Sequence, residues 1–271
     1  MLRTFTVCDV QLNIKLSPGL GNGGLVWPST FILAEHIRTT IGATLCGSRI
    51  AELGAGTGLL GIWAATQGAH VVLTDLTELL PLLMENVSLN MDQISKGGGS
   101  VRVLSLVWGG KTEIPAAVMD CSLIIGSDLV HWIAFTLFDE DTRSLLCQTM
   151  CELLRESSTK KVYLCHEVRT EQRETQFVRM INEVGLRVHQ ESTVSYSAWS
   201  DVGGDALHSG FLFNGVGKCA SECSKVSGEG LSVTAHSSRE LDGEKRDVVI
   251  LQVSSAHELR PFSTERMHCP Q

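Results

Sequence analysis

The 271-residue sequence predicts an α/β fold built on one doubly wound, mostly parallel sheet with an antiparallel last strand. Two observations predict this fold. Short, nearly continuous apolar runs alternate with helical patterns, as expected of parallel strands that helices cover on both faces. The last two apolar runs, 186–194 and 247–253, have no helical pattern between them, so we expect them to pair antiparallel.

The expected elements follow in a regular order. The strand candidates are short apolar runs, at 50–53, 71–74, 101–106, 121–126, 161–165, 186–194 and 247–253. The helix candidates have apolar residues three to four positions apart, at 29–38, 59–66, 77–90, 139–155 and 171–184. Pro81 fits the first turn of its helix, where its missing N–H costs little, and Gly185 ends the last helix.

A change of composition divides the chain. The stretch 214–246 is rich in Ser, Gly, Lys and Glu and poor in large apolar residues, so it buries too little to order itself. The expected organisation is an N-terminal extension at 1–25, a main domain at 26–213, a flexible insert at 214–246, the last strand of the same domain at 247–254 and a tail at 255–271.

Charge and hydropathy exclude several classes of function. The net charge is −8 and no block of Lys or Arg stands out, which argues against a nucleic-acid-binding protein. The segment 53–74 has no formal charge, but five glycines, Gln67 and His70 interrupt it. A spanning helix needs about 20 mostly apolar residues, so we expect no membrane segment here. We also expect a monomer.

Cysteine usage indicates the compartment. The nine cysteines are an odd number without a repeating spacing, and the N-terminus lacks the apolar core of a signal peptide. Free thiols in a reducing compartment follow, so we expect a cytoplasmic protein, with the nucleus as a second location. Cys219 and Cys223 stand four apart, but no second pair completes a ligand set, so we expect no metal site.

The stretch RIAELGAGTGLLGIWAATQGAHVVLTD, residues 49–75, carries the strongest functional signal. Its glycines follow the first strand of the alternating pattern, where they let a ligand approach the backbone and the N-terminus of the next helix. Asp75 stands 21 residues after Gly54, at the tip of the next strand, and its carboxylate can accept both hydroxyls of a ribose. This layout predicts a cofactor that contains adenosine.

Two such cofactors compete. Gly56, Gly58 and Gly61 match the G-x-G-x-x-G pattern of dinucleotide sites, followed by an acid. S-adenosylmethionine sites commonly read acid-x-G-x-G-x-G, and the sequence from Glu52 to Gly58 has that form. Glu52 favours S-adenosylmethionine, because a carboxylate there repels a pyrophosphate but can anchor a cationic amino-acid group, directly or through water. A glycine bend that only packs a strand against a helix is the third reading.

Landmarks beyond the glycine loop extend this reading. With "ELGAGTGLLGI", the chain carries in order Val26-Trp27-Pro28, Asn86-Val-Ser-Leu-Asn90, Val107-Trp108-Gly109, Gly126-Ser127-Asp128-Leu-Val-His131 and Cys165-His-Glu-Val-Arg169. In this combination the chain resembles the family-16 seven-strand methyltransferases, the methyltransferase-like protein-lysine methyltransferases, a few of which act on arginine or histidine. The resemblance covers about residues 20–200 and the last strand. It implies a Rossmann-like seven-stranded methyltransferase sheet.

The resemblance also implies roles for single residues. Asp75 matches the ribose-binding acid, and Trp108 the tryptophan beside adenine. Trp27 matches the tryptophan that closes over the cofactor, and Ser127 the small residue lining its site. The loop contacts of the family correspond to Gly54, Ala55 and Gly56. Core packing remains the alternative for the two tryptophans, and helix capping for the acid.

The acceptor side departs from the family. Its usual D-x-x-Y motif here ends in histidine, so Asp128 is kept and His131 replaces the tyrosine. We expect Asp128 to orient an incoming lysine amine and His131 to be a candidate proton acceptor, or else only to cover the sheet edge. The expected activity is S-adenosylmethionine-dependent methylation of a lysine in a protein substrate. An NAD(P)-dependent oxidoreductase and a non-catalytic cofactor-binding scaffold are the alternatives.

Overall fold

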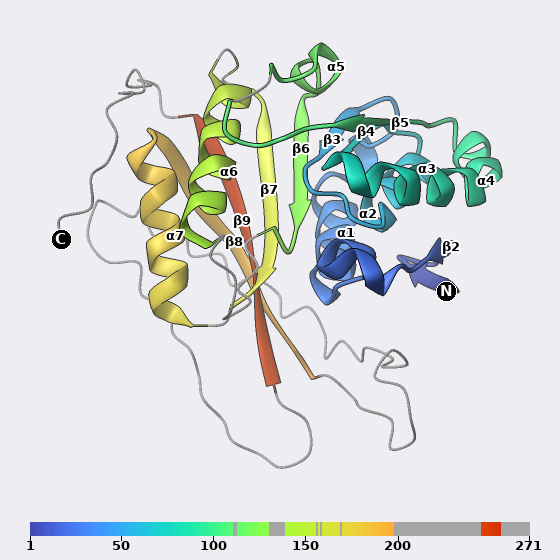
Figure 1. Ribbon diagram of the computed structural model, residues 1–271, viewed down its shortest axis with the longest axis horizontal. Helices are drawn as coiled ribbons and strands as arrows, with labels where there is room; N and C mark the ends of the chain where they lie inside the picture. Colours follow the sequence, from blue (N-terminus) through green and yellow to red (C-terminus); the bar gives the residue numbers. More distant parts are fainter. Residues whose placement is uncertain are drawn as a thin grey trace.

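The computed structural model describes residues 1–110, 113–129, 139–155, 157, 159–168, 170–197 and 245–255. Its centre is a seven-stranded sheet in the order β5-β4-β3-β6-β7-β9-β8, and a separate hairpin, β1-β2, stands at the start of the chain (Figure 1). Strands β3 to β7 are parallel to one another, and β9 is antiparallel to both β7 and β8. The predicted doubly wound sheet with an antiparallel last strand is confirmed.

Each predicted strand and helix is observed with small differences at its ends, and the structure adds the N-terminal hairpin, the short helices α4 and α5, and the 3-10 helices η1 and η2. The strands are β1 Leu2–Val7, β2 Val10–Lys15, β3 Arg49–Glu52, β4 His70–Asp75, β5 Ser100–Ser105, β6 Leu123–Ser127, β7 Lys161–Glu167, β8 Leu186–Ser197 and β9 Lys245–Ser255. The α-helices are α1 Pro28–Ile41, α2 Leu59–Thr66, α3 Leu80–Leu89, α4 Met91–Lys96, α5 Ala116–Met119, α6 Asp139–Leu154 and α7 Glu171–Glu183. Short 3-10 helices are η1 Pro18–Gly24, η2 Gly42–Thr44 and η3 Thr77–Leu79.

Side-chain alternation along the strands gives the sheet two buried faces. Ile50 of β3 and Val71 of β4 pack in one hydrophobic cluster with α1, α2, α3 and the hairpin. Their neighbours Ala51 and Val72 pack in a second cluster with α5, α6 and α7. Helices therefore cover both faces, as the near-continuous apolar strands predict.

The uncharged segment at 53–74 is not a membrane span. It contains the glycine bend, an eight-residue helix α2, and most of β4. Across the described residues, no helix has the length and apolar character that crossing a membrane requires.

The first 25 residues, set apart above as an extension, fold against the sheet domain. The β1-β2 hairpin turns at Cys8 and Asp9, which both have positive φ. Leu12 and Ile14 of β2 are fully buried in the same cluster as α1 and α2. The predicted insert at 214–246 lies almost wholly outside the described residues, which resume at β9.

Two asparagines of α3 hold the hairpin. The Asn86 side chain accepts a hydrogen bond from the Lys15 N–H (2.8 Å) and donates to the carbonyls of Lys15 (3.1 Å) and Thr57 (2.9 Å). Asn90, one turn later, bonds the N–H and carbonyl of Asn13 in the same way. The amides thus pair with the free edge of β2 as a neighbouring strand does, and Asn86 also fixes the glycine loop at Thr57.

Replacing Asn86 by alanine is expected to lower the free energy of unfolding by about 2–3 kcal/mol, because three buried hydrogen-bonding groups lose their partner. Chemical denaturation of the purified protein measures this. Ser88→Ala, an exposed change between the two asparagines on α3, is the matched control and is expected to change stability by less than about 0.5 kcal/mol. Equal stabilities of the two variants would contradict the role given to Asn86.

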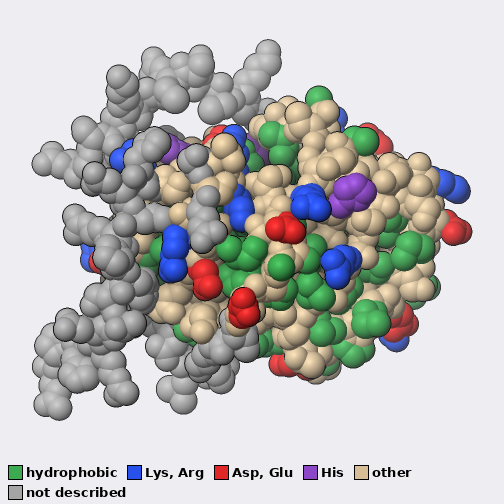
Figure 2. Space-filling model, turned by 90° about the horizontal axis from the view of Figure 1, so that it is seen from above, with side chains coloured by type: hydrophobic (Ala, Val, Ile, Leu, Met, Phe, Trp, Pro, Cys, Tyr) green, Lys and Arg blue, Asp and Glu red, His purple; other side chains and the backbone are tan. Residues whose placement is uncertain are grey.

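Basic side chains gather at the amino edge of the sheet. Figure 2 looks onto this edge and shows Lys, Arg and His side chains among hydrophobic ones. Arg49, His70, Arg102 and Asp120 contribute to a hollow of about 260 Å³ there. Ligands of open α/β sheets bind at the opposite, carboxyl edge, so we expect the active site there.

Candidate active site

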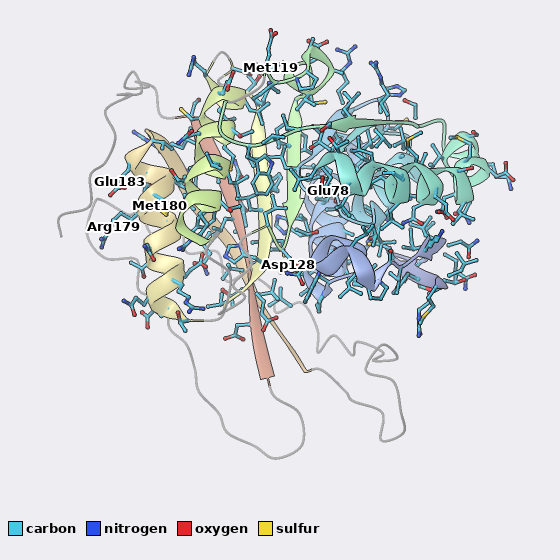
Figure 3. All side chains as sticks on the ribbon, viewed as in Figure 1. Glu78, Met119, Asp128, Arg179, Met180 and Glu183 are labelled. Carbon is cyan, nitrogen blue, oxygen red and sulfur yellow. The ribbon has the colours of Figure 1, made fainter. Side chains whose placement is uncertain are left out.

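The glycine loop and the acid after β6 meet where the winding of the sheet reverses. Strands β3 and β6 are adjacent, and the Leu53 N–H donates to the carbonyl of Ile125 (2.9 Å). The helix after β3 covers one face of the sheet and the helix after β6 covers the other, and ligands of open α/β sheets bind between two such loops. Figure 3 places Asp128 at the lower end of β6, away from Met119 at the upper edge.

The glycine loop needs glycine for both conformation and space. Gly54, Gly56 and Gly58 have φ of 56°, 54° and 79°, in the left-handed region that side chains disfavour. A Cβ on Gly54 would lie 2.7 Å from Leu129 Cδ2 and 3.3 Å from Trp108 Cζ2. Trp108 therefore lies directly against this loop, on the carboxyl edge where the sequence places it.

The 3-10 segment η1 lies over the middle of the same loop. A Cβ on Gly56 would approach the carbonyl oxygen of Gly23 to 2.9 Å. The indole N–H of Trp27 donates to the neighbouring carbonyl of Asn22 (3.0 Å). This contact ties Trp27 to the segment that lies on the glycine loop.

Asp75 is joined to the glycine loop by its side chain. Its Oδ2 accepts a hydrogen bond from the Gly56 N–H and its Oδ1 accepts one from the Leu76 N–H, both at 2.7 Å. Burial raises the pKa of the Asp75 carboxyl, and the two N–H donors oppose that rise. Ala55, between the glycines, donates its N–H to the Thr74 carbonyl (2.9 Å) and fixes the loop against β4.

Glu52 is a buried carboxylate at the end of β3, 2% exposed. Its Oε2 accepts a hydrogen bond from the Gly61 N–H (2.8 Å) in the first turn of α2. Burial raises the pKa of the Glu52 carboxyl to about 8, against the effect of the Gly61 N–H, and the charge of Asp75 adds to the rise. Within the described part of the chain, neither carboxylate has a Lys or Arg partner.

The pKa of Glu52 makes stability depend on pH. Because the folded value of about 8 exceeds the unfolded value of 4.5, this group stabilises the fold fully below pH 4.5, and the contribution is lost as the pH rises through 8. Glu52→Gln keeps an acceptor for Gly61 and removes the titration. We expect it to raise the unfolding temperature at about pH 9 and to change it little at about pH 5.

Thermal unfolding of the ligand-free protein across this pH range measures the effect. Glu113→Gln, which changes an exposed loop carboxylate, is the control and is expected to give no such divergence. If the difference in unfolding temperature between Glu52→Gln and the wild type stays constant from pH 5 to 9, the raised pKa assigned to Glu52 is wrong.

Asp128 is held in an unusual conformation after β6. Its φ is 53°, and its N–H donates to the Cys165 carbonyl (2.8 Å). Its Oδ2 accepts a hydrogen bond from the Ser29 hydroxyl in the first turn of α1, and its Oδ1 faces the Glu167 N–H at 3.4 Å. Non-glycine residues in this backbone region are uncommon and cluster at functional sites.

Ser127 connects to the same helix. Its hydroxyl lies 3.1 Å from that of Thr30, next in sequence to Ser29. The first turn of α1, directly after Trp27, therefore touches both Ser127 and Asp128. No sequence motif marks Ser29 or Thr30. Their burial (1% and 6% exposed), unusual for polar residues at the start of a helix, is visible only in the structure.

The structure thus gathers most of the predicted site residues at one edge. Glu52, Ala55, Asp75, Ser127 and Asp128 belong to this set, as do the two tryptophans and the glycines of the loop. His131 lies outside the described residues, and its role stays a prediction. Among the described residues, no group of three His, Cys, Asp or Glu side chains is suited to a metal ion. Cys219 and Cys223 lie outside the described residues.

Comparisons with known proteins show the family. A family described as "Lysine methyltransferase" matches residues 7–184. EEF1A lysine methyltransferase 3 of Mus musculus is 32% identical over 179 residues, which are 65% of this chain and 70% of that protein. Protein N-lysine methyltransferase METTL21A of Mus musculus is 32% identical over 203 residues, 74% of this chain and 84% of that protein.

A solved structure supports the fold alone. It is the T. thermophilus 16S rRNA N2 G1207 methyltransferase RsmC in complex with AdoMet and guanosine, with a TM-score of 0.50 and 14% sequence identity. The match covers 70% of this chain and 47% of that one.

Proposed function

The chain belongs to the lysine methyltransferase family, whose methyl donor is S-adenosylmethionine, and on this premise we propose how its residues divide the work of methylating a lysine in a protein. The glycine loop, Asp75 and Trp108 hold the donor. Asp128 orients the amine that receives the methyl group. The observation that carries this division is that the two sets of residues lie at the carboxyl ends of the neighbouring strands β4, β3 and β6, at the point where the sheet reverses its winding.

The residues present fit this donor. Glu52 and Asp75 are buried near each other without a cation partner among the described residues, and burial raises the pKa of both carboxyl groups. A positively charged ligand would favour their ionised forms, whereas a pyrophosphate would oppose them. Glycine at positions 54 and 56 lets Leu129, Trp108 and η1 pack closely against the loop, on the side where the donor is proposed to bind. The NAD(P)-dependent alternative is therefore less favourable on electrostatic grounds.

When bound, S-adenosylmethionine supplies an activated methyl group on a sulfonium, so the protein mainly has to align and desolvate the acceptor. A lysine must first lose a proton, and burial in an apolar slot lowers its pKa and frees the nitrogen lone pair. Asp128 is placed to accept a hydrogen bond from that amine. His131 is the candidate to take the proton.

The experiment that tests the proposal uses the purified protein, methyl-labelled S-adenosylmethionine and a cell lysate, followed by mass spectrometry of any labelled band. Purified EEF1A is added as one candidate substrate, because a similar protein is named for it. The expected product is methyl-lysine. A label on arginine or histidine would correct the acceptor, and no labelled protein would favour a non-catalytic scaffold.

The proposal extends to location and partners. The protein acts in the cytoplasm, with the nucleus as a second site, as a monomer that binds no nucleic acid. Support comes from the net charge of −8 and from six described cysteines that are all free thiols. Light scattering is expected to give a mass near 29.4 kDa, and cell fractionation tests the location.

A further inference from the structure

Helix α1 begins beside the acid that faces the acceptor. Pro28, Ser29 and Thr30 form its first turn, directly after Trp27. Ser29 is 1% exposed, and its hydroxyl donates to Oδ2 of Asp128, although 99 residues separate the two in sequence. Buried polar groups in folded proteins need hydrogen-bond partners, so this contact joins the start of α1 to the end of β6.

The contact limits how the carboxylate can rotate. Asp128 Oδ2 is held by Ser29, while Oδ1 faces the Glu167 N–H at 3.4 Å. The backbone of Asp128 is fixed as well, by the bond from its N–H to Cys165 and by its φ of 53°. A carboxylate fixed at both the backbone and the side chain is held in one orientation.

From this geometry we infer that Ser29 is a positioning residue for methyl transfer, which holds Asp128 in the orientation that receives the amine. The inference rests on the proposed function. The inference also couples the donor side and the acceptor side of the site, because Trp27, on the donor side, directly precedes the turn of α1 that carries Ser29. Thr30 extends the coupling by its bond to Ser127 (3.1 Å).

The inference predicts a split between turnover and binding. Ser29→Ala is expected to lower kcat about 3- to 10-fold, the effect of one lost oriented hydrogen bond, and to leave the dissociation constant of S-adenosylhomocysteine within about twofold. Ser29→Thr keeps the hydroxyl and is expected to recover most of the lost kcat. Thr40→Ala removes an exposed hydroxyl from the far end of α1 and is the matched control, with kcat unchanged.

A second readout does not depend on activity. Thermal unfolding of the ligand-free protein is measured for Ser29→Ala, for Asp128→Ala and for the double variant. Ser29→Ala is expected to lower the unfolding midpoint by about 2 °C in the wild-type background and by less than about 1 °C in the Asp128→Ala background, because the partner is already gone.

The outcomes separate this inference from the proposed function. If the wild-type protein transfers methyl groups but Ser29→Ala keeps the full kcat, the positioning role is wrong and the proposed function stands. The positioning role is also wrong if Ser29→Ala and Ser29→Thr lose kcat equally. It is wrong as well if the changes in unfolding midpoint of the two single variants add up in the double variant. If the wild-type protein transfers no methyl group to any protein, both fail together.

Discussion

Replacing Asp128 by alanine is expected to lower methyl transfer at least about 100-fold while S-adenosylhomocysteine binds within about twofold of the wild-type affinity. The carboxylate lies at the end of β6, where its oxygens contact the Ser29 hydroxyl and the Glu167 N–H, whereas the Asp75 carboxylate bonds the Gly56 N–H of the glycine loop. Loss of the carboxylate therefore removes the orientation of the amine and leaves the donor contacts in place.

Alanine at this position also has to adopt a φ of 53°, so a second variant separates chemistry from strain. Asp128→Asn tolerates this backbone and keeps an acceptor for Ser29, but it loses the charge. It is expected to lose most of the activity without loss of stability. Asp120→Ala, at the exposed opposite edge, is the control and should stay active. If calorimetry shows that Asp128→Asn no longer binds S-adenosylhomocysteine, the division between donor and acceptor residues is wrong.

Asp75→Ala is expected to weaken donor binding by about 1–3 kcal/mol, or roughly 5- to 150-fold in the dissociation constant. Two effects combine. The variant removes the carboxylate that the resemblance assigns to the ribose, and it releases the N–H of Gly56, which Oδ2 of Asp75 holds at 2.7 Å. The glycine loop then loses a fixed contact on the side facing the ligand.

Isothermal titration with S-adenosylhomocysteine measures the change. Glu78→Ala removes an exposed carboxylate three residues further on, in η3, and serves as the control for a general loss of negative charge. We expect it to change the dissociation constant less than threefold. If Asp75→Ala binds as tightly as the wild type, Asp75 is not part of the donor site.

The sequence predicts the elements around the glycine loop well, because local signals agree there. Helix α2 has the predicted bounds, and β3 and β4 differ from the prediction by a residue or two at their ends. The glycines, the apolar helix and the strand that ends in Asp75 all indicate the same arrangement, so tertiary contacts did not have to override local preference.

The N-terminal hairpin was missed for a physical reason. Its turn is Cys8-Asp9, without the Asn-Gly or Asp-Gly pair that marks such turns, although both residues have positive φ. The alternation of buried Leu12 and Ile14 with exposed Gln11 and Asn13 was the available signal. Its partners, Asn86 and Asn90, lie more than 70 residues away, a distance that local patterns do not reach.

The candidate site shows the same limit. Asp128 and Asp75 were found because a motif or a strand end marks them. No sequence motif indicates Ser29, because its contact with Asp128 depends on the packing of α1 against the end of β6. The charge of Glu52, directly before the glycine loop, indicates its role from the sequence. The hydrogen bond between its carboxylate and the first turn of α2 is visible only in the structure.

We expect an adenosine-containing methyl donor to bind at the carboxyl ends of β3 and β4. A crystal structure of the protein with S-adenosylhomocysteine tests it directly. The predicted result is a ligand beside the glycine loop, with its ribose hydroxyls on Asp75 and its adenine near Trp108. A crevice that stays filled by Leu129 and Trp108, with no ligand at Asp75, would contradict it.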